Sequence, residues 1–279
     1  MKNIWYRFCK NKLAVAGFVI LMIFVILAVF APLIAPYDPF KMNPDNMLNA
    51  PSFKHWFGTD QFGRDILSRV IYGSRISFKV GIISVGISLL IGTTMGIFAG
   101  FYGGIIDGII SRIMDVMFSF PHILLALVIM AILGANLTNL MIAIGIVYIP
   151  IFGRIARGSV MSIKDNLYIE AADSIGVHNF IIMWRHILPN ILAPVIVQTT
   201  LSFGFAIRAE AALSFLGLGV EPDVPSWGIM LNEGKDWMEM AWWVAVYPGV
   251  SATLAILSFN VLGDGLRDAL DPKLKNESE

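Results

Sequence analysis

Charge and cysteine are both scarce in this sequence. Charged residues make up 14% of its 279 residues, and Cys9 is the single cysteine. One cysteine excludes an internal disulfide and any metal cluster built from cysteine ligands. The formal net charge is zero, so the chain has no basic field of the kind that attracts nucleic acid. Disulfide scaffolds and nucleic-acid-binding proteins are therefore excluded.

Signatures of catalysis and of nucleotide binding are also missing. The four histidines have no metal-ligand spacing, and no serine stands in a G-x-S-x-G elbow. The string closest to a nucleotide-binding loop starts at Gly228, but Asp236 follows Lys235 where such a loop needs Ser or Thr. We therefore expect a chain that is not an enzyme and that holds no metal or cofactor itself.

Apolar residues, by contrast, make up 57% of the chain, well above their share in soluble domains. Uncharged runs of about 20 residues are long enough to cross a bilayer as helices. We predict an all-α membrane protein with six transmembrane helices, of which the first is an uncleaved N-terminal anchor. The predicted spans are 13–34, 80–101, 121–133, 137–152, 191–216 and 241–262.

Two periodic patterns indicate how these helices meet. Small residues recur at every fourth position of the second span, at Gly92, Gly96, Gly100 and Gly104. Such a row lets another helix backbone come close in lipid. Polar residues recur at the same spacing in segment 103–120, at Asp107, Ser111, Asp115 and Ser119. We interpret this segment as an amphipathic stretch at the inner surface that leads into the third span.

A long polar segment, 37–77, separates the first two spans and carries two acid–base pairs at helical spacing. Asp60 and Arg64 are four residues apart, as are Asp65 and Arg69, so each pair is expected to lie along one helical face. A second outer loop, with an acidic bias, precedes the last span. Aromatic residues in and beside it are expected to mark the outer membrane interface: Trp227, Trp237, Trp242 and Trp243.

Basic residues predict the orientation in the membrane. Six spans put both termini on one side, together with the loop 153–189. That side carries about twice as many Lys and Arg residues as the other, and the excess marks the cytoplasm. We therefore predict that both termini and the loop 153–189 are cytoplasmic.

The most informative part of that loop is segment 168–189. Asn166 can cap a short helix, and Gly176 ends it, as glycine does where the chain turns left-handed. A second helical piece starts near Asn179, and Pro189 marks the start of the next span. Helix, bend and helix form a compact knob.

The first helix of the knob carries Glu170, Ala171 and Ala172. We expect both small alanines on the surface of the knob, where they fit a groove on a partner. The alternative is an amphipathic loop that only rests on the lipid surface.

Arg208 and Glu210 are the ionisable residues placed deepest in a predicted span. Charged groups at such depth are functional candidates by default. Two interpretations stay open. They line the substrate pathway, or they pair with charges on a partner subunit or line a wet cavity without touching substrate.

The knob matches a known loop in six residues: Glu170, Ala171, Ala172, Gly176, Leu188 and Pro189. It resembles the EAA loop of the permease subunits of ABC importers, where an I-x-L-P ending follows the glycine. His186 replaces the first isoleucine of that ending. The resemblance implies that these six residues couple the permease to a cytoplasmic ATPase and carry no chemistry of their own.

Three further stretches, 55–77, 213–231 and 259–273, are similar to the dipeptide, oligopeptide and nickel branch of these permeases, as its second, C-type component. The resemblance covers nearly the whole chain. It implies the type I ABC importer permease fold, with cytoplasmic coupling helices. It also implies a location in the cytoplasmic (inner) membrane of a bacterium or archaeon.

The implied partners are a second, similar permease chain, two cytoplasmic ATPases that bind ATP and magnesium, and an extracytoplasmic substrate-binding protein. The implied domains are an anchor span with an extracytoplasmic segment at 1–76, a transmembrane domain at 77–264 and a short cytoplasmic tail at 265–279.

We expect this chain to form half of the translocation pathway of an ATP-driven importer of dipeptides, oligopeptides or a related small solute. Nickel, metal chelates and glutathione are alternative substrates for the same mechanism. A secondary transporter acting alone is less favoured because no inverted repeat is visible. A membrane-embedded enzyme is disfavoured by the missing catalytic motifs.

Overall fold

The computed structural model describes residues 2–219 and 223–270, and the regular structure in these ranges is helical. Five helices are long and apolar enough to cross a membrane, and one bent pair of helices can form a sixth span. The prediction of an all-α membrane protein is confirmed.

The bounds of the described elements are α1 Lys2–Lys10, α2 Lys12–Val29, α3 Ala31–Ile34, the 3₁₀ turn η1 Pro44–Asn46, α4 Ile66–Tyr102, α5 Gly104–Phe118, α6 His122–Leu133, α7 Leu137–Ile163, α8 Leu167–Ser174, α9 Asn179–Ile181, the π-helical turn η2 Ile182–Ile187, α10 Leu188–Phe215, α11 Trp227–Lys235 and α12 Trp243–Leu270.

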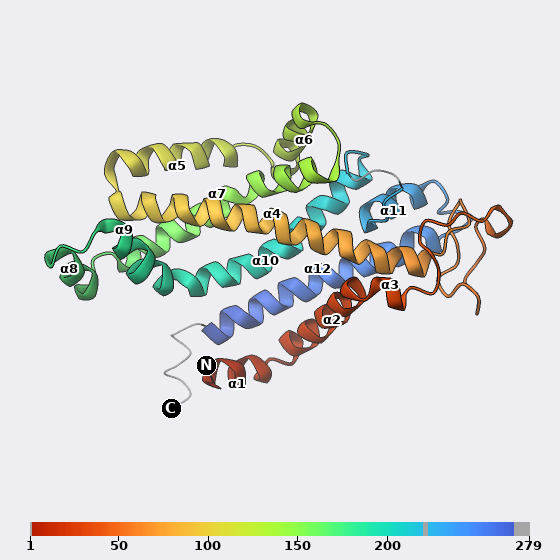
Figure 1. Ribbon diagram of the computed structural model, residues 1–279, viewed down its shortest axis with the longest axis horizontal. Helices are drawn as coiled ribbons and strands as arrows, with labels where there is room; N and C mark the ends of the chain where they lie inside the picture. Colours follow the sequence, from red (N-terminus) through yellow and green to blue (C-terminus); the bar gives the residue numbers. More distant parts are fainter. Residues whose placement is uncertain (1, 220–222, 271–279) are drawn as a thin grey trace.

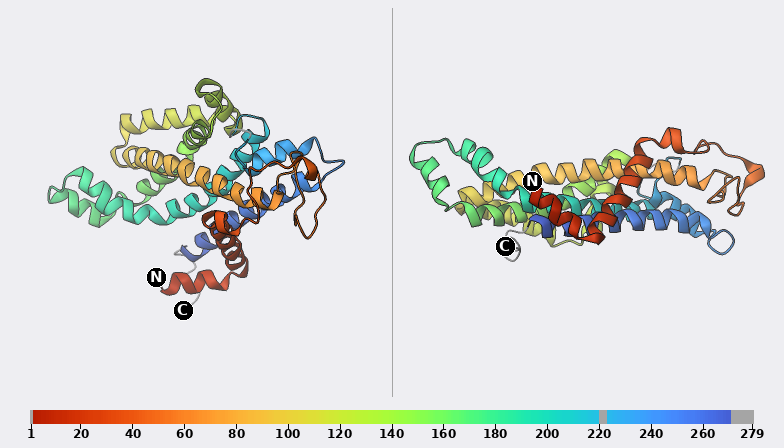
Figure 2. Two further views of the ribbon diagram at one scale, coloured as in Figure 1. Left: turned by 45° about the vertical axis from the view of Figure 1, so that its right-hand side comes forward. Right: turned by 90° about the horizontal axis from the view of Figure 1, so that it is seen from below.

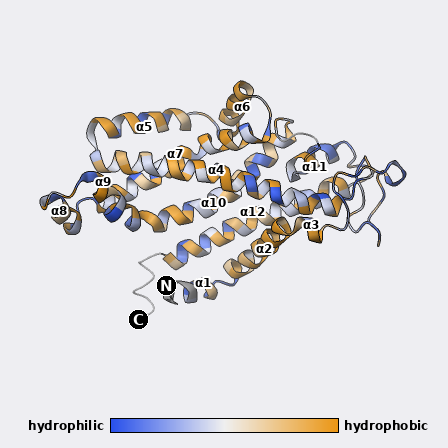
Figure 3. Cartoon of the chain, viewed as in Figure 1, coloured by the Kyte–Doolittle hydropathy of each residue, from blue (hydrophilic) through white to orange (hydrophobic). Residues whose placement is uncertain are grey.

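The long helices form an elongated bundle (Figure 1). Helix α4 packs along α7, α10 packs against α12 and α4, and α2 lies at the edge beside α12 (Figure 2). Helices α8 and α9 lie at one end of the long axis, and α11 and the segment 35–65 lie toward the other, whereas α1 lies nearer the middle, beside α12 (Figure 1). Figure 3 shows apolar residues along the helices and hydrophilic ones concentrated near the two ends.

Helices α4 and α7 are in close contact along the predicted glycine row. A β-carbon added at Gly96 lies 2.7 Å from the β-carbon of Ala156, and one added at Gly92 lies 2.7 Å from that of Phe152. Contacts this short leave no room for a side chain on α4. Gly92, Gly96 and Gly100 therefore have the predicted packing role, whereas Gly104 is the first residue of α5 and a β-carbon there meets no atom within 4 Å.

Several helices continue beyond the predicted spans. Helix α4 begins at Ile66 rather than 80, α7 ends at Ile163 rather than 152, and α12 ends at Leu270 rather than 262. Hydropathy detects only the part of a helix that crosses lipid, but helical hydrogen bonds continue where the helix enters water. Residues 271–279 of the predicted tail lie outside the described residues.

The predicted third span, 121–133, corresponds to α6, and a sharp bend separates α6 from the amphipathic helix before it. Helices α5 and α6 meet at an angle of 93° across residues 119–121. Pro121 lacks a backbone N–H and cannot continue the hydrogen-bond ladder of α5. Helix α6 has 12 residues, about 18 Å at the rise of an α-helix, and is too short to cross roughly 30 Å of hydrocarbon alone.

The polar stripe of α5 faces arginines of α7. Asp107 accepts hydrogen bonds from Arg157, and Asp115 accepts one from Arg154 at 2.7 Å. The amphipathic character predicted for segment 103–120 is confirmed, and its polar face serves to attach α5 to α7.

Two tryptophans expected at the membrane interface are instead core residues. Trp227 is fully buried and donates from Nε1 to the carbonyl of Val70 at 3.1 Å. Trp243 is buried and donates from Nε1 to the carbonyl of Thr59 at 3.2 Å. The interface prediction is wrong for both, because each ring fills the space between the outer segments and the bundle. Trp242 is exposed, as predicted.

Candidate functional site

The knob has the predicted helix–bend–helix form. Asn166 occupies the N-cap of α8, although its side chain donates or accepts no capping hydrogen bond, and Gly176 has a φ of +76°. A β-carbon at Gly176 meets no other atom within 4 Å. Glycine is therefore required there by the left-handed backbone and not by crowding. The knob projects from one end of the bundle (Figure 1).

The two alanines of the knob differ in environment. Ala171 is exposed together with Glu170, whereas Ala172 is buried in the main hydrophobic core cluster. The prediction that both alanines lie on the surface is wrong for Ala172. Adjacent positions on a helix point about 100° apart, so a small helix packed on one side cannot expose both.

Exposed apolar side chains flank Ala171 on α8 and recur on the next two elements of the knob, and none of them was predicted from the sequence as part of the site. Leu167 is 83% exposed and Ile175 is 80% exposed, one at each end of α8. On α9 and η2 the exposed members are Phe180, Ile181 and Trp184. Apolar residues gathered on a projecting element mark an interaction surface. The knob contains more apolar side chains than its short helices can bury, and that excess is the sequence signal by which they could have been found.

The second half of the knob is continuous with the next span. Helix α9, the π-helical turn η2 and α10 form one apolar helical run, Asn179–Phe215. Leu188 and Pro189 lie in the first turn of α10, where a proline needs no N–H partner. The helical run continues from the second half of the knob through Pro189 into α10.

Arg208 and Glu210 lie two residues apart on α10 in different environments. Glu210 is fully buried and accepts hydrogen bonds from Ser77 at 3.3 Å and Ser214 at 2.9 Å. Arg208 is exposed and lies over the ring of Phe205, 5.2 Å from its centroid. The structure therefore does not bring the two predicted pathway residues together: one is enclosed among hydroxyls and the other faces outward.

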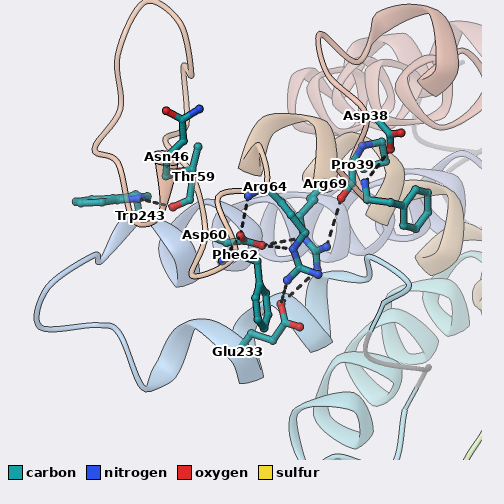
Figure 4. A network of polar contacts seen from close by, with 11 residues as sticks. Asp38, Pro39, Asn46, Thr59, Asp60, Phe62, Arg64, Arg69, Glu233 and Trp243 are labelled. Carbon is teal, nitrogen blue, oxygen red and sulfur yellow. Dashed lines mark hydrogen bonds and ion pairs between the residues drawn. The ribbon is translucent and has the colours of Figure 1, made fainter. Parts of the chain in front are cut away.

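A buried polar network ties the outer segment to α4 and α11 (Figure 4). Arg64 donates to Asp60 at 2.6 Å and to Glu233 at 3.0 Å, and Arg69 donates to Glu233 at 3.2 Å. Both arginine side chains are almost fully buried. Burial raises the pKa of Glu233 above its ordinary value, and the two arginines oppose that rise.

Only one of the two predicted acid–base pairs is present. Asp60 and Arg64 form an ion pair, as predicted, although they precede the helix. Asp65 does not pair with Arg69: it caps α4 by accepting from the Ser68 N–H at 2.8 Å, and it contacts His55 Nδ1 at 2.8 Å. The N-cap position fixes the direction of its carboxylate and turns it away from the helix face that Arg69 occupies.

The chain matches two family models. Residues 92–276 match the binding-protein-dependent transport system inner membrane component, and residues 1–51 match the N-terminal TM domain of oligopeptide transport permease C. The chain therefore belongs to the family of inner membrane components of binding-protein-dependent transport systems. It is a multi-pass, non-catalytic permease subunit of an ABC importer, and the other components of such a system are an ATPase and a binding protein.

Individual relatives are similar over nearly their full length. The chain is 52% identical over 267 residues to the dipeptide transport system permease protein DppC of Alkalihalophilus pseudofirmus, covering 96% of this chain and 88% of that protein. It is 46% identical over 282 residues to the di/tripeptide transport system permease protein DppC of Pseudomonas aeruginosa, covering 99% and 93%.

A third relative has a different printed substrate. The glutathione transport system permease protein GsiD of Escherichia coli is 46% identical over 272 residues, covering 97% of this chain and 90% of that protein. Among solved structures, the inward facing conformation of the MetNI methionine ABC transporter matches with a TM-score of 0.59 and 17% identity, covering 74% of this chain and 98% of that chain. That match shows the fold alone.

Proposed function

We propose that this chain forms half of the translocation pathway of an ABC importer for dipeptides and other short peptides. Relatives with 52% and 46% identity carry dipeptide and di/tripeptide transport in their names, which supports this substrate class. Glutathione is the second candidate, because a relative equally similar to the second of these is named for it. Both candidates are small peptides with free carboxylates.

The proposed partner of the knob is a cytoplasmic ATPase. The supporting observation is the exposed apolar surface around Glu170 and Ala171, on an element that projects from the bundle and continues into α10. In this proposal ATP binding moves the knob, Gly176 keeps its bend, and α10 carries the motion into the membrane. Leu188 and Pro189 form the junction through which the motion passes.

The remaining partners follow from the same proposal. A second, similar permease chain completes the pathway, two ATPases sit beneath the pair, and a binding protein delivers the substrate from outside. The knob and both termini then face the cytoplasm, as the excess of basic residues on that side indicates.

Substitution at Ala171 tests the coupling role. The permease with Ala171→Trp, its partner permease, the ATPases and the binding protein are reconstituted in liposomes, and peptide uptake is measured. We expect uptake to be lost, because the added ring prevents the knob from fitting its groove, while the amount of inserted permease is unchanged. Ala171→Ser is the matched control and should transport normally.

Two results would argue against this proposal. Wild-type uptake by the Ala171→Trp variant contradicts docking through this surface. Uptake driven by an ion gradient in the absence of any ATPase favours a transporter that acts alone. Binding measurements on the cognate binding protein, with dipeptides and glutathione compared, identify the substrate.

A further inference from the structure

The break between α5 and α6 lies beside the middle of the long helices α4 and α7 (Figure 1). Helix α5 starts next to the end of α4 and has 15 residues, about 22 Å of helix, which is less than the roughly 30 Å of hydrocarbon. Residues 119–121 at the break are exposed in this chain. Irregular backbone at membrane depth is tolerated only where protein covers it or water reaches it. We therefore expect protein or water, rather than lipid, to cover this face in the assembled transporter.

A row of aromatic and cationic side chains crosses this face. Its members come from α5, α6, α7 and α10, and each contacts the next: Arg154, Phe118, His122, Tyr148, Phe205 and Arg208. The row follows the transport direction, because Arg154 lies toward the end of α7 next to the knob, whereas Arg208 lies toward the end of α10 next to α11.

The contacts inside the row are regular. The Arg154 guanidinium lies 4.0 Å from the ring centroid of Phe118. The rings of His122 and Tyr148 are stacked at 5.6 Å, and those of Tyr148 and Phe205 at 6.2 Å. Tyr148 is buried between the rings of His122 and Phe205, so it supports them, whereas His122 is exposed and Phe118 and Phe205 are half-buried. The accessible parts of these three rings present apolar surface, which suits the uncharged part of a short peptide.

The two arginines at the ends of the row differ in their partners. Arg154 pairs with Asp115, whereas no carboxylate of residues 2–219 and 223–270 pairs with Arg208. An exposed cation inside a membrane span faces a wet cavity or a partner, and it attracts an anion. Arg208 can therefore bind an anionic group of another molecule.

We propose that this row lines the translocation pathway and that Arg208 binds the carboxylate of the peptide as it passes. The inference rests on the proposed importer function and adds a site and a chemical class of ligand to it. The aromatic rings support the uncharged part of the substrate. Arg154 is paired with Asp115, whereas Arg208 has no carboxylate partner among the described residues, so its positive charge is available to the ligand.

Thiol labelling tests whether Arg208 faces water. Cys9 is the single cysteine of this chain, so in a Cys9→Ser background Arg208→Cys is the only thiol of the permease, and its labelling is measured on the separated permease band. The complete transporter is treated with a charged, water-soluble thiol reagent, once without nucleotide and once trapped with an ATP analogue. We expect the reagent to label this position in at least one of the two states. The matched control is Ile207→Cys, whose native side chain is fully buried and which should stay unlabelled. An unreactive thiol at position 208 in both states means that lipid or the partner subunit covers it, and overturns the proposal.

Uptake measurements test the anion site. We expect Arg208→Gln to lower the rate of dipeptide uptake about tenfold, the size of one lost charge-assisted hydrogen bond, and Arg208→Lys to retain most of it. ATP hydrolysis stimulated by the binding protein should persist in Arg208→Gln, because the knob is intact. If the importer proposal itself is wrong, the wild-type protein will show no such stimulated hydrolysis either. Equal uptake by wild type and Arg208→Gln overturns the proposal. So does equal loss of uptake in Arg208→Lys and Arg208→Gln.

Discussion

Arg157 on α7 holds Asp107 on α5 through two parallel hydrogen bonds, one of which joins Nη2 to Oδ2 at 2.7 Å. Both side chains are partly buried, at 32% and 20% exposure. The half-helix α5 packs against few other elements, and its other faces expose isoleucines. This bidentate pair is therefore the main polar attachment of α5 to the bundle.

Asp107→Asn is expected to destabilise the purified permease by about 1–2 kcal/mol, because a bidentate, partly buried ion pair is replaced by a single neutral contact. Thermal unfolding followed by tryptophan fluorescence measures the change. Asp115→Asn is the control: its partner Arg154 is about half exposed, so the loss should be below about 1 kcal/mol. An equal or larger effect at Asp115 contradicts this ranking.

Gly96→Ala is expected to destabilise the protein by roughly 1–3 kcal/mol, because the added carbon collides with α7 at Ala156 and separates the helices. Gly86→Ala on the same helix is the matched control, since a β-carbon there meets no atom within 4 Å. That control should be neutral or stabilise by up to about 1 kcal/mol through helix propensity. Similar losses of stability in both variants would show that close approach of α4 and α7 does not explain why glycine recurs along α4.

Gly176→Ala isolates the bend of the knob. Nothing crowds this glycine, so the expected cost of about 1 kcal/mol comes from the left-handed backbone alone. We expect reduced coupling, measured as peptide transported per ATP hydrolysed, and a smaller loss in Gly176→Asn, because asparagine tolerates this conformation better. Gly158→Ala, in an uncrowded helical position of α7, should leave coupling unchanged.

Stability is expected to depend on pH through Glu233. Its pKa is raised in the folded protein by burial, so the folded state binds a proton that the unfolded chain has already released. By linkage, stability rises as pH falls from above the raised pKa toward the ordinary glutamate value. The pH dependence of the unfolding temperature should flatten in that window in Glu233→Gln. A wild type that loses stability there relative to Glu233→Gln contradicts the direction.

Much of the architecture follows from local sequence. Apolar runs specify helices that cross lipid, and Gly176 specifies a bend that other residues adopt poorly. The glycine row on α4 predicts a close helix contact before its partner is known. These features depend on residues that are near one another in the chain, and they were predictable for that reason.

Other features depend on contacts between distant segments. The burial of Ala172, the core position of Trp227 and the turn of Asp65 away from Arg69 each reflect a neighbour far along the chain or a capped helix end. The angle of 93° between α5 and α6 was not predicted, because Pro121 indicates that a helix ends or kinks but the sequence pattern does not record in which direction the next helix runs.

The sequence by itself determined an all-helical membrane permease with a projecting helix–glycine–helix knob, because apolar length and glycine placement act locally. Only the tertiary structure decided that Glu210 is enclosed among serines while Arg208 stands open beside a row of rings. Which side of α10 is covered depends on how α4, α7 and α11 pack around it, and no pattern within α10 encodes that packing.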